Sequence, residues 1–174
     1  MSYKAEDKPL TVKAVKALIP IVLSPKWRND AGLLMAVKKG WIFPGKIVED
    51  QMIEMSGGLL KVNTNPNRSE DFDDYSDAKF LTVSPWKYEN RASLDWQAFK
   101  NKKGALRMVI YERIQNRLYY FYIPRRAYKD MRVIKIPFDR KTGDPKDTNK
   151  WWAYEVDSFK ELARIKKEDW INIR

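Results

Sequence analysis

The chain has 174 residues, enough for one domain with a sizeable core, and its 44% hydrophobic content excludes a disordered polyelectrolyte. Lysine and arginine number 34 against 23 acidic residues, a net charge of +11, so we expect affinity for polyanions such as nucleic acid. The sequence contains no cysteine and no histidine, which excludes disulfides, thiolate metal sites and any mechanism that needs a histidine base.

The first third of the chain has the apolar spacing of helices. We predict helices within residues 12–23, 27–39 and 46–55. Pro20 should kink or end the first of them, whereas Pro44 suits the first turn of the third. Gly57 and Gly58 should end that third helix.

From residue 59 onwards the pattern changes to that of strands. We expect a short strand at 59–62 and longer ones at 77–84, 105–114, 118–123, 131–136 and 151–156. Residues 115–117 are predicted to form a hairpin turn, and Ser158 and Glu161 have capping-box spacing before a last helix at 159–167. The sequence therefore predicts one mixed α/β domain over 1–174, helical in 1–58, with a mostly antiparallel sheet and a C-terminal helix in 59–174.

The acidic residues are concentrated in one segment of this basic protein. Residues 100–150 carry fifteen basic and five acidic side chains, whereas residues 70–77 hold five carboxylates. Crowded carboxylates repel one another, so such a cluster is either solvated or holds a cation. Asp77 and Lys79 begin an apolar strand, where alternate residues point to the same face. Two carboxylates that hold Mg²⁺ and a nearby lysine are the groups that phosphodiester hydrolysis needs when histidine is absent.

The spacing Asp71-x5-Asp77-x-Lys79 resembles the active-site signature of the PD-(D/E)XK, or restriction-endonuclease-like, nucleases. It is most similar to that of the MutH-type mismatch-repair nicking endonucleases and their restriction-enzyme relatives. The resemblance implies that Asp71 and Asp77 are metal ligands and that Lys79 is the catalytic lysine. Asp73 and Asp74 are alternative candidates for the first acid.

The same resemblance implies two further catalytic residues. A helix carboxylate precedes the signature in that family, and Glu49 fits its position, with Glu54 as the alternative. A lysine ahead of a later apolar strand also fits, either Lys102 or Lys103, and we assign Lys103 to this catalytic role. The implied fold is restriction-endonuclease-like, with flanking helices around the sheet.

The implied function is Mg²⁺-dependent hydrolysis of double-stranded DNA, restriction-like or nicking, with Mn²⁺ as a substitute metal and a homodimer as one arrangement. Basic residues in the loops should contact phosphates. The expected DNA-binding residues are Lys100, Lys102, Arg125, Arg126 and Lys129. Residues 119–122 should pack in the core, whereas the pair Trp151 and Trp152 is the better candidate for stacking on bases, with one of the two expected to be buried.

Two other classes of function stay open at this point. The chain could be a non-enzymatic, basic DNA-binding accessory protein whose acidic segment is a surface loop. It could also be a protein–protein adaptor. We expect a cytoplasmic protein, because the start of the chain does not resemble a signal peptide and no apolar run reaches membrane-spanning length.

Overall fold

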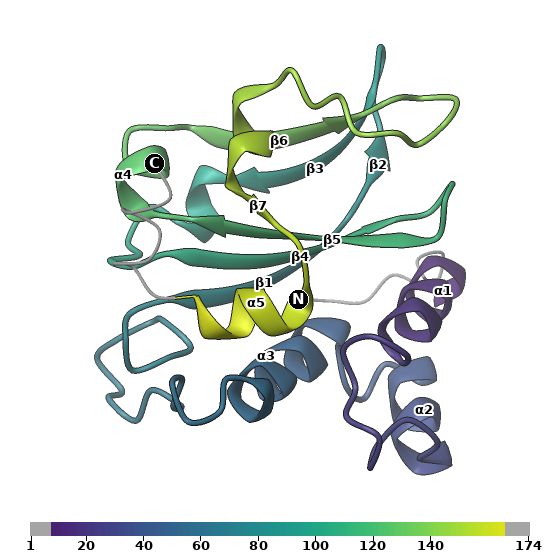
Figure 1. Cartoon of the computed structure of the whole chain (residues 1–174), viewed down its shortest axis with the longest axis vertical. Helices are drawn as coiled ribbons and strands as arrows, with labels where there is room; N and C mark the ends of the chain where they lie inside the picture. The colour runs from purple at the N-terminus through teal and green to yellow at the C-terminus, as the bar shows by residue number, and fades with distance from the viewer. Residues whose placement is uncertain (1–7, 166–174) are drawn as a thin grey trace.

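The computed structural model describes residues 8–165 and shows two β-sheets with helices packed around them (Figure 1). Its first helices are α1 (Lys8–Leu18), α2 (Ala31–Lys38) and α3 (Pro44–Met55). As predicted, α1 ends before Pro20 and Pro44 lies in the first turn of α3. The chain leaves α3 through Gly57 and Gly58, whose φ angles of 65° and 93° favour glycine.

The larger sheet has the strand order β1-β4-β5-β7. These strands are β1 (Asp77–Thr82), β4 (Leu106–Glu112), β5 (Arg117–Ile123) and β7 (Glu155–Val156). The edge strand β1 runs parallel to β4, and the other neighbours are antiparallel. β4 is buried throughout and β5 at all but its first residue, which confirms the prediction of two central strands.

The smaller sheet is antiparallel, with the order β2-β3-β6. Its strands are β2 (Ser84–Pro85), β3 (Asn90–Asp95) and β6 (Val133–Phe138). Trp152 packs between the sheets, with ring contacts to Tyr119 and Phe121 of the larger sheet and to Phe138 of the smaller one. The helices α3 and α5 (Phe159–Arg164) lie on the opposite side of the larger sheet from β3 and β6 (Figure 1).

Short helical segments make the remaining connections. They are η2 (Trp96–Ala98), α4 (Arg125–Tyr128) and η3 (Lys150–Tyr154). The N-terminus of α5 follows the prediction, because the Ser158 hydroxyl accepts the Glu161 N–H at 3.0 Å. Within the described residues α5 ends at Arg164, and the rest of the helix predicted at 159–167 lies outside them.

Several predicted elements were wrong. Residues 59–62 form a single bridge, between Val62 and Phe72, and no strand. Most of the strand predicted at 151–156 is the helix η3, because the Asn149 side chain accepts the Trp151 N–H and starts a helical turn. Trp151 and Trp152 are both buried, so neither is available to stack on bases.

One hydrophobic cluster joins the helices to both sheets. It extends from Leu18 of α1 through Met52 of α3 and Val109 of β4 to Ile136 of β6. Among residues 8–165, no helix is both long and apolar enough to cross a membrane. The observed architecture is the predicted mixed α/β class, in which β1 and β4 both begin at one end of the larger sheet.

Candidate active site at the start of β1

Asp77, the first residue of β1, is the centre of the candidate site. Its side chain is only 2% exposed, and the residue lies opposite Leu106, the first residue of β4. One carboxylate oxygen accepts the Asp71 N–H at 3.0 Å. The other lies 2.9 Å from the ammonium of Lys79 and 3.3 Å from that of Lys102. A buried carboxylate needs such partners, because an unpaired charge in a protein interior is strongly unfavourable.

Asp71 is fixed against Asp77 by a reciprocal arrangement. Its backbone N–H donates to Asp77, and its own Oδ2 accepts the Ala78 N–H at 2.9 Å. The loop that carries Asp71 is held in place by fully buried Phe72 and by Asn63, whose side-chain amide donates to the Glu70 carbonyl at 2.9 Å. The two carboxyl groups therefore face each other across the start of β1.

The electrostatic environment of Asp71 favours its neutral form. Burial raises the pKa of Asp71 to about 7, and the nearby charge and hydrogen bond of Asp77 add to this increase. The charge of Glu49 also contributes. Positive charge placed beside Asp71 would lower this pKa, because it favours the ionised carboxylate.

The two predicted helix carboxylates of α3 lie in different surroundings. Glu49 is close enough to Asp71 to raise its pKa, and it pairs with Lys46 at 3.4 Å. Glu54 instead accepts a hydrogen bond from Gln51 and lines a separate cavity beside Trp27. The structure thus brings Glu49, and not Glu54, toward the acid pair.

The alternative first acids point elsewhere. Asp74 forms an ion pair with Arg107 at 3.2 Å and accepts hydrogen bonds from Ser76. Asp73 is exposed, and its side chain accepts the Lys61 N–H at 3.4 Å. Of the three candidates, Asp71 is the one beside Asp77.

The lysine that reaches Asp77 from the loop before β4 is Lys102, so the catalytic assignment of Lys103 is not supported by its position. The Lys102 ammonium also donates to the Ser69 carbonyl at 2.8 Å. Lys103 is exposed, and its backbone N–H donates to buried Glu70 while its side chain lines a cavity on the other side of the loop. Lys102 and Lys103 point in different directions in this irregular loop, and sequence alone could not decide which one faces Asp77.

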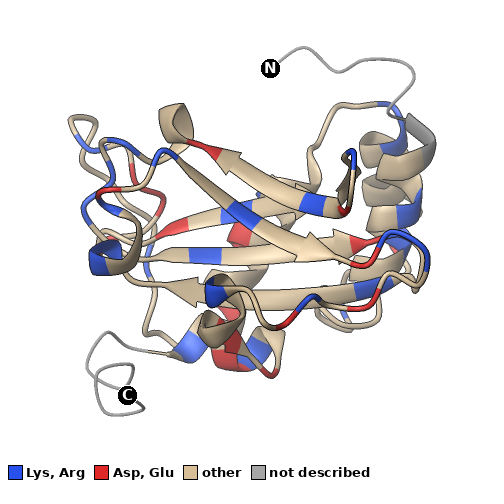
Figure 2. Ribbon diagram, turned by 90° about the horizontal axis from the view of Figure 1, so that it is seen from above, with Lys and Arg blue, Asp and Glu red and all other residues tan. Residues whose placement is uncertain are grey.

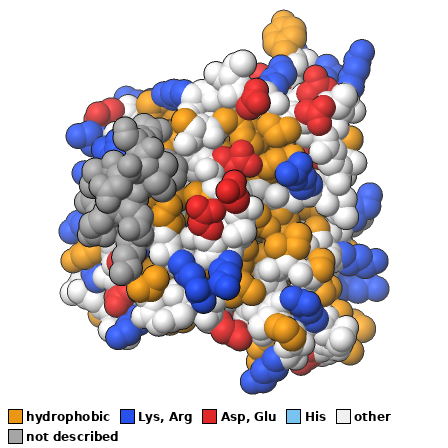
Figure 3. Space-filling model, viewed as in Figure 1, with side chains coloured by type: hydrophobic (Ala, Val, Ile, Leu, Met, Phe, Trp, Pro, Cys, Tyr) orange, Lys and Arg blue, Asp and Glu red, His pale blue; other side chains and the backbone are white. Residues whose placement is uncertain are grey.

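The other expected DNA-binding residues are exposed. Arg125 donates to the Lys102 carbonyl at 3.2 Å, which joins α4 to the site loop. Arg126 and Lys129 lie on and just after α4, and the Lys100 ammonium stacks on Trp96 at 4.7 Å. Figure 2 shows Lys and Arg on α4 and on the loops at the same end of the molecule. On the face seen in Figure 3 the basic residues are scattered among acidic and apolar ones, so they form no single patch there.

The acid pair consists of the kind of oxygen ligands that a cation of the Mg²⁺ type uses. Mg²⁺ is held in many proteins by one or two carboxylates and keeps several water ligands. Asp71 and Asp77 can supply two carboxylates, and Lys79 and Lys102 already bring two ammonium groups to Asp77. Within residues 8–165, no three acidic side chains are close enough together to form a larger metal cluster.

Arg107 and Glu70 are site-adjacent residues that the sequence analysis missed. Arg107 is buried, and its guanidinium holds Ser76, the residue before Asp77, through a hydrogen bond of 3.0 Å. Glu70 is buried beside Asp71. A single arginine within the apolar run of β4 is a signal that could have identified the first, whereas Glu70 is hidden among the other acids.

No protein-family model, curated protein or solved structure matches this chain. The geometry of the site therefore carries the functional argument.

Proposed function

We propose that this chain is a Mg²⁺-dependent endonuclease that hydrolyses phosphodiester bonds of double-stranded DNA, by nicking or by restriction-like cleavage. The observation that carries the proposal is the acid pair, in which Asp71 and Asp77 face each other. Two lysines, Lys79 and Lys102, contact the Asp77 carboxylate. A purely structural ion pair would need one lysine and one carboxylate. Two carboxyl groups crowded at one place, one of them with a raised pKa, are typical of a functional site.

Asp71 and Asp77 would hold the metal, and Glu49 would add negative charge beside Asp71. When bound there, Mg²⁺, or Mn²⁺ in its place, would supply Lewis-acid activation of a water molecule. The Lys79 ammonium lies 2.9 Å from Asp77, where it can orient that water or stabilise charge on the phosphate. Lys102 brings a second ammonium to the same carboxylate oxygen and could also stabilise charge on the phosphate.

The DNA would approach the end of the larger sheet where β1 and β4 begin. Arg125, Arg126 and Lys129 are exposed at this end and can neutralise phosphates on either side of the cleaved bond. A homodimer would cut both strands, and a monomer would nick one. A cytoplasmic location agrees with a DNA substrate and with the absence of cysteine.

A second function, a non-enzymatic DNA-binding accessory protein, is favoured by one observation. Both oxygens of Asp77 and one of Asp71 already accept protein hydrogen bonds or ion pairs. In this alternative Lys79 and Lys102 neutralise the acid pair without a metal. The pair then serves only to fix the loop that carries Asp71 against the start of β1. The basic surface would then bind DNA without chemistry.

The deciding experiment is cleavage of supercoiled plasmid and of genomic DNA with Mg²⁺, with Mn²⁺ and with chelator. Asp77→Asn and Lys79→Met remove one site group each and keep the side-chain size, and Asp147→Asn alters an exposed acid elsewhere. We expect metal-dependent nicked or linear product from the parent protein and from Asp147→Asn only. Thermal unfolding would check that all variants are folded. Equal DNA binding by all proteins with no product on either DNA would instead establish the accessory-protein function.

A further inference from the structure

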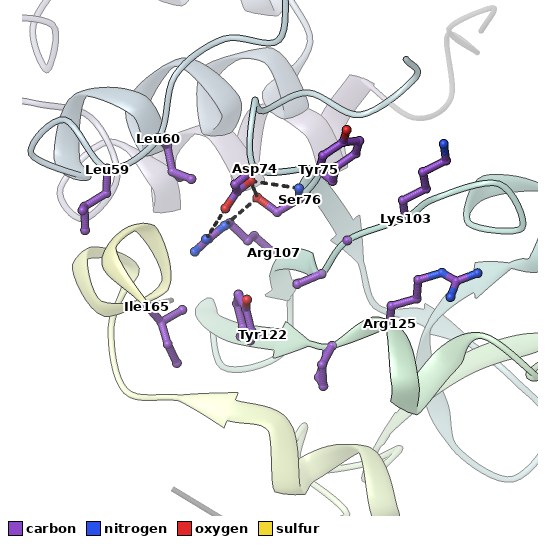
Figure 4. A pocket seen from close by; sticks show the side chains of 13 residues that line it. Leu59, Leu60, Asp74, Tyr75, Ser76, Lys103, Arg107, Tyr122, Arg125 and Ile165 are labelled. Atoms are coloured by element: carbon purple, nitrogen blue, oxygen red, sulfur yellow. Dashed lines mark hydrogen bonds and ion pairs between the residues drawn. The ribbon is translucent and has the colours of Figure 1, made fainter. Parts of the chain in front are cut away.

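A cavity of about 390 Å³ is lined by Arg107 and Tyr122 of the larger sheet (Figure 4). It lies at the same end of that sheet as the acid pair but on the other face. In β1 and β4 the register places Asp77 beside Leu106 and Ala78 beside Arg107, so the side chain of Arg107 points away from the face of Asp77. Arg107 lines the cavity, as does Ser76, the residue before Asp77. The volume is within the range of roughly 300–1,000 Å³ that is typical of small-ligand sites.

The two ends of this cavity differ in chemistry. Leu59 and Ile165 lie at one end, and Lys103 and Arg125 lie at the other (Figure 4). Tyr122 forms part of the wall between them. The apolar end suits a flat, uncharged ring, and the basic end suits an anion. A molecule that joins both features, a ring linked to a phosphate, is a nucleotide.

The polar middle of the cavity is rigidly held. The Arg107 guanidinium donates to the Leu162 carbonyl at 2.6 Å and to Asp74 at 3.2 Å, and it stacks over the Tyr122 ring. Asp74 also accepts hydrogen bonds from Ser76. Fixed donors and acceptors beside an apolar space can read the polar edge of a base.

The cavity and the acid pair are separated by the loop of residues 102–104 and the backbone of residues 75–76. Gly104 packs directly on the Tyr75 backbone, since a Cβ built at Gly104 would lie 2.3 Å from the Tyr75 carbonyl oxygen. Lys102 faces Asp77, whereas its neighbour Lys103 lines the cavity. The basic end of the cavity is connected to the loop that carries Lys102, because Arg125 donates a hydrogen bond to the Lys102 carbonyl. A phosphate at the basic end would therefore lie beside the loop whose Lys102 contacts Asp77 on the other face.

We propose that this cavity accepts one nucleotide of the DNA strand, with its base turned out of the stack into the apolar end and its phosphate at Lys103 and Arg125. The inference rests on the proposed DNA binding, but it does not need the cleavage reaction. Extrusion of a base costs least at a mismatch or a damaged position, so the cavity would favour such DNA. The cavity thus adds a means of substrate selection to the proposed nuclease.

The test uses duplexes that carry 2-aminopurine, a base whose emission rises when it leaves the stack, at a paired or a mismatched central position. Binding is followed by anisotropy of an end label, without divalent metal, so that no cleavage is needed. Leu59→Trp fills the apolar end of the cavity, and Val62→Trp is the matched control, since Leu59 and Val62 are 43% and 54% exposed and only Leu59 lines the cavity. Free 2-aminopurine deoxynucleoside monophosphate serves as the competing ligand.

We expect an emission rise on binding of the parent protein and of Val62→Trp, larger for the mismatched duplex, and its loss in Leu59→Trp with DNA affinity retained. Binding without any rise on either duplex overturns the cavity assignment and leaves the proposed nuclease unaffected. Tight binding of the free nucleotide with no rise on DNA overturns the strand-bound form in favour of a free-nucleotide site. A rise without cleavage in the plasmid experiment keeps the cavity and overturns the nuclease, and no DNA binding at all overturns both.

Discussion

Lys102 meets Asp77 through an ion pair of 3.3 Å, although the smaller-sheet strands β2 and β3 lie between them in the chain. Lys79 binds the same carboxylate oxygen at 2.9 Å. Two ammonium groups on one oxygen exceed what charge neutralisation of Asp77 requires. The ammonium of Lys102 is therefore best explained as balancing the negative charge of Asp71, or that of a substrate bound beside the pair.

The neighbouring lysines give a matched pair of variants. Lys102→Ala should lower the cleavage rate by about 10²-fold, because it removes a cation positioned for the phosphate. Lys103→Ala should leave the rate at saturating DNA nearly unchanged and weaken DNA binding, since its side chain lines the other side of the loop. Single-turnover cleavage and anisotropy titrations of both variants would measure this. Equal losses of rate in the two variants would refute the distinction between them.

The fold was predictable where an element carries its own periodic pattern. α3 has a proline start, an apolar stripe and a glycine stop, and β4 and β5 are continuous apolar runs. Strand β3 was missed because its sequence from Asn90 to Asp95 contains only one large apolar residue, Leu94, and its buried face also holds Asn90 and Ala92. Such a strand is specified by pairing with β6, a distant segment, and not by local preference.

The site was predictable only as far as its linear motif extends. The spacing of Asp71, Asp77 and Lys79 is local, because the loop returns directly to the start of β1. The choice between Lys102 and Lys103 depends on the direction of side chains in an irregular loop, which has no period. Arg107 contacts Leu162 of α5 and Asp74, which are both far from it in the sequence. The only sign of this role in the local sequence is a charged residue within an apolar strand.

The raised pKa of Asp71 predicts how stability depends on pH. Burial and the charge of Asp77 raise this pKa from 3.8 to about 7, so the folded protein keeps a proton that the unfolded chain has already released in this range. The stability contribution is present below pH 3.8 and is lost progressively as the pH rises to about 7. We expect Asp71→Asn to unfold a few degrees higher than the parent protein at pH 8 without metal, and at nearly the same temperature at pH 4.

The effect of Mg²⁺ on the melting temperature tests whether the ionised acid pair binds a metal. At pH 8 Mg²⁺ should raise the melting temperature of the parent protein, because it binds the ionised acid pair, and it should have little effect on Asp71→Asn. Asp147→Asn, an exposed acid outside the site, should behave as the parent does in both measurements. A parent protein whose stability is unaffected by Mg²⁺ at pH 8 would count against metal binding.

Gly104 is a second sensitive position near the site. Gly104→Ala places a methyl group against the Tyr75 backbone, which must move and would carry Ser76 and Asp77 with it. We expect a loss of about 1–3 kcal/mol of unfolding free energy and a large loss of cleavage. Gly45→Ala is the matched control, because a Cβ there meets nothing within 4 Å, and its stability should be unchanged or slightly higher. Urea unfolding with parallel cleavage assays would show whether only Gly104 is constrained.

Arg107 should contribute to stability more than any exposed arginine does. Arg107→Met leaves the Leu162 carbonyl and the Ser76 hydroxyl without their guanidinium donor and releases Asp74 from its ion pair. The expected cost is at least about 2 kcal/mol in urea unfolding. Arg113→Met, at an exposed turn position, should change the free energy of unfolding by less than about 0.5 kcal/mol. A small effect at Arg107 would mean that the buried network relaxes around the substitution.

The salt dependence of DNA binding tests which basic residues contact phosphates. If Arg126 and Lys129 each neutralise one phosphate, alanine at either position should reduce the slope of log K against log salt concentration by about 0.9. Lys13→Ala, at an exposed position of α1, should leave the slope unchanged, because α1 lies at the opposite end of the molecule from α4 (Figure 1). This prediction holds for the nuclease and for the accessory protein alike, since both need the same DNA-binding end. Equal slopes for all three variants would show that the DNA binds elsewhere, and the acid pair would then face no substrate.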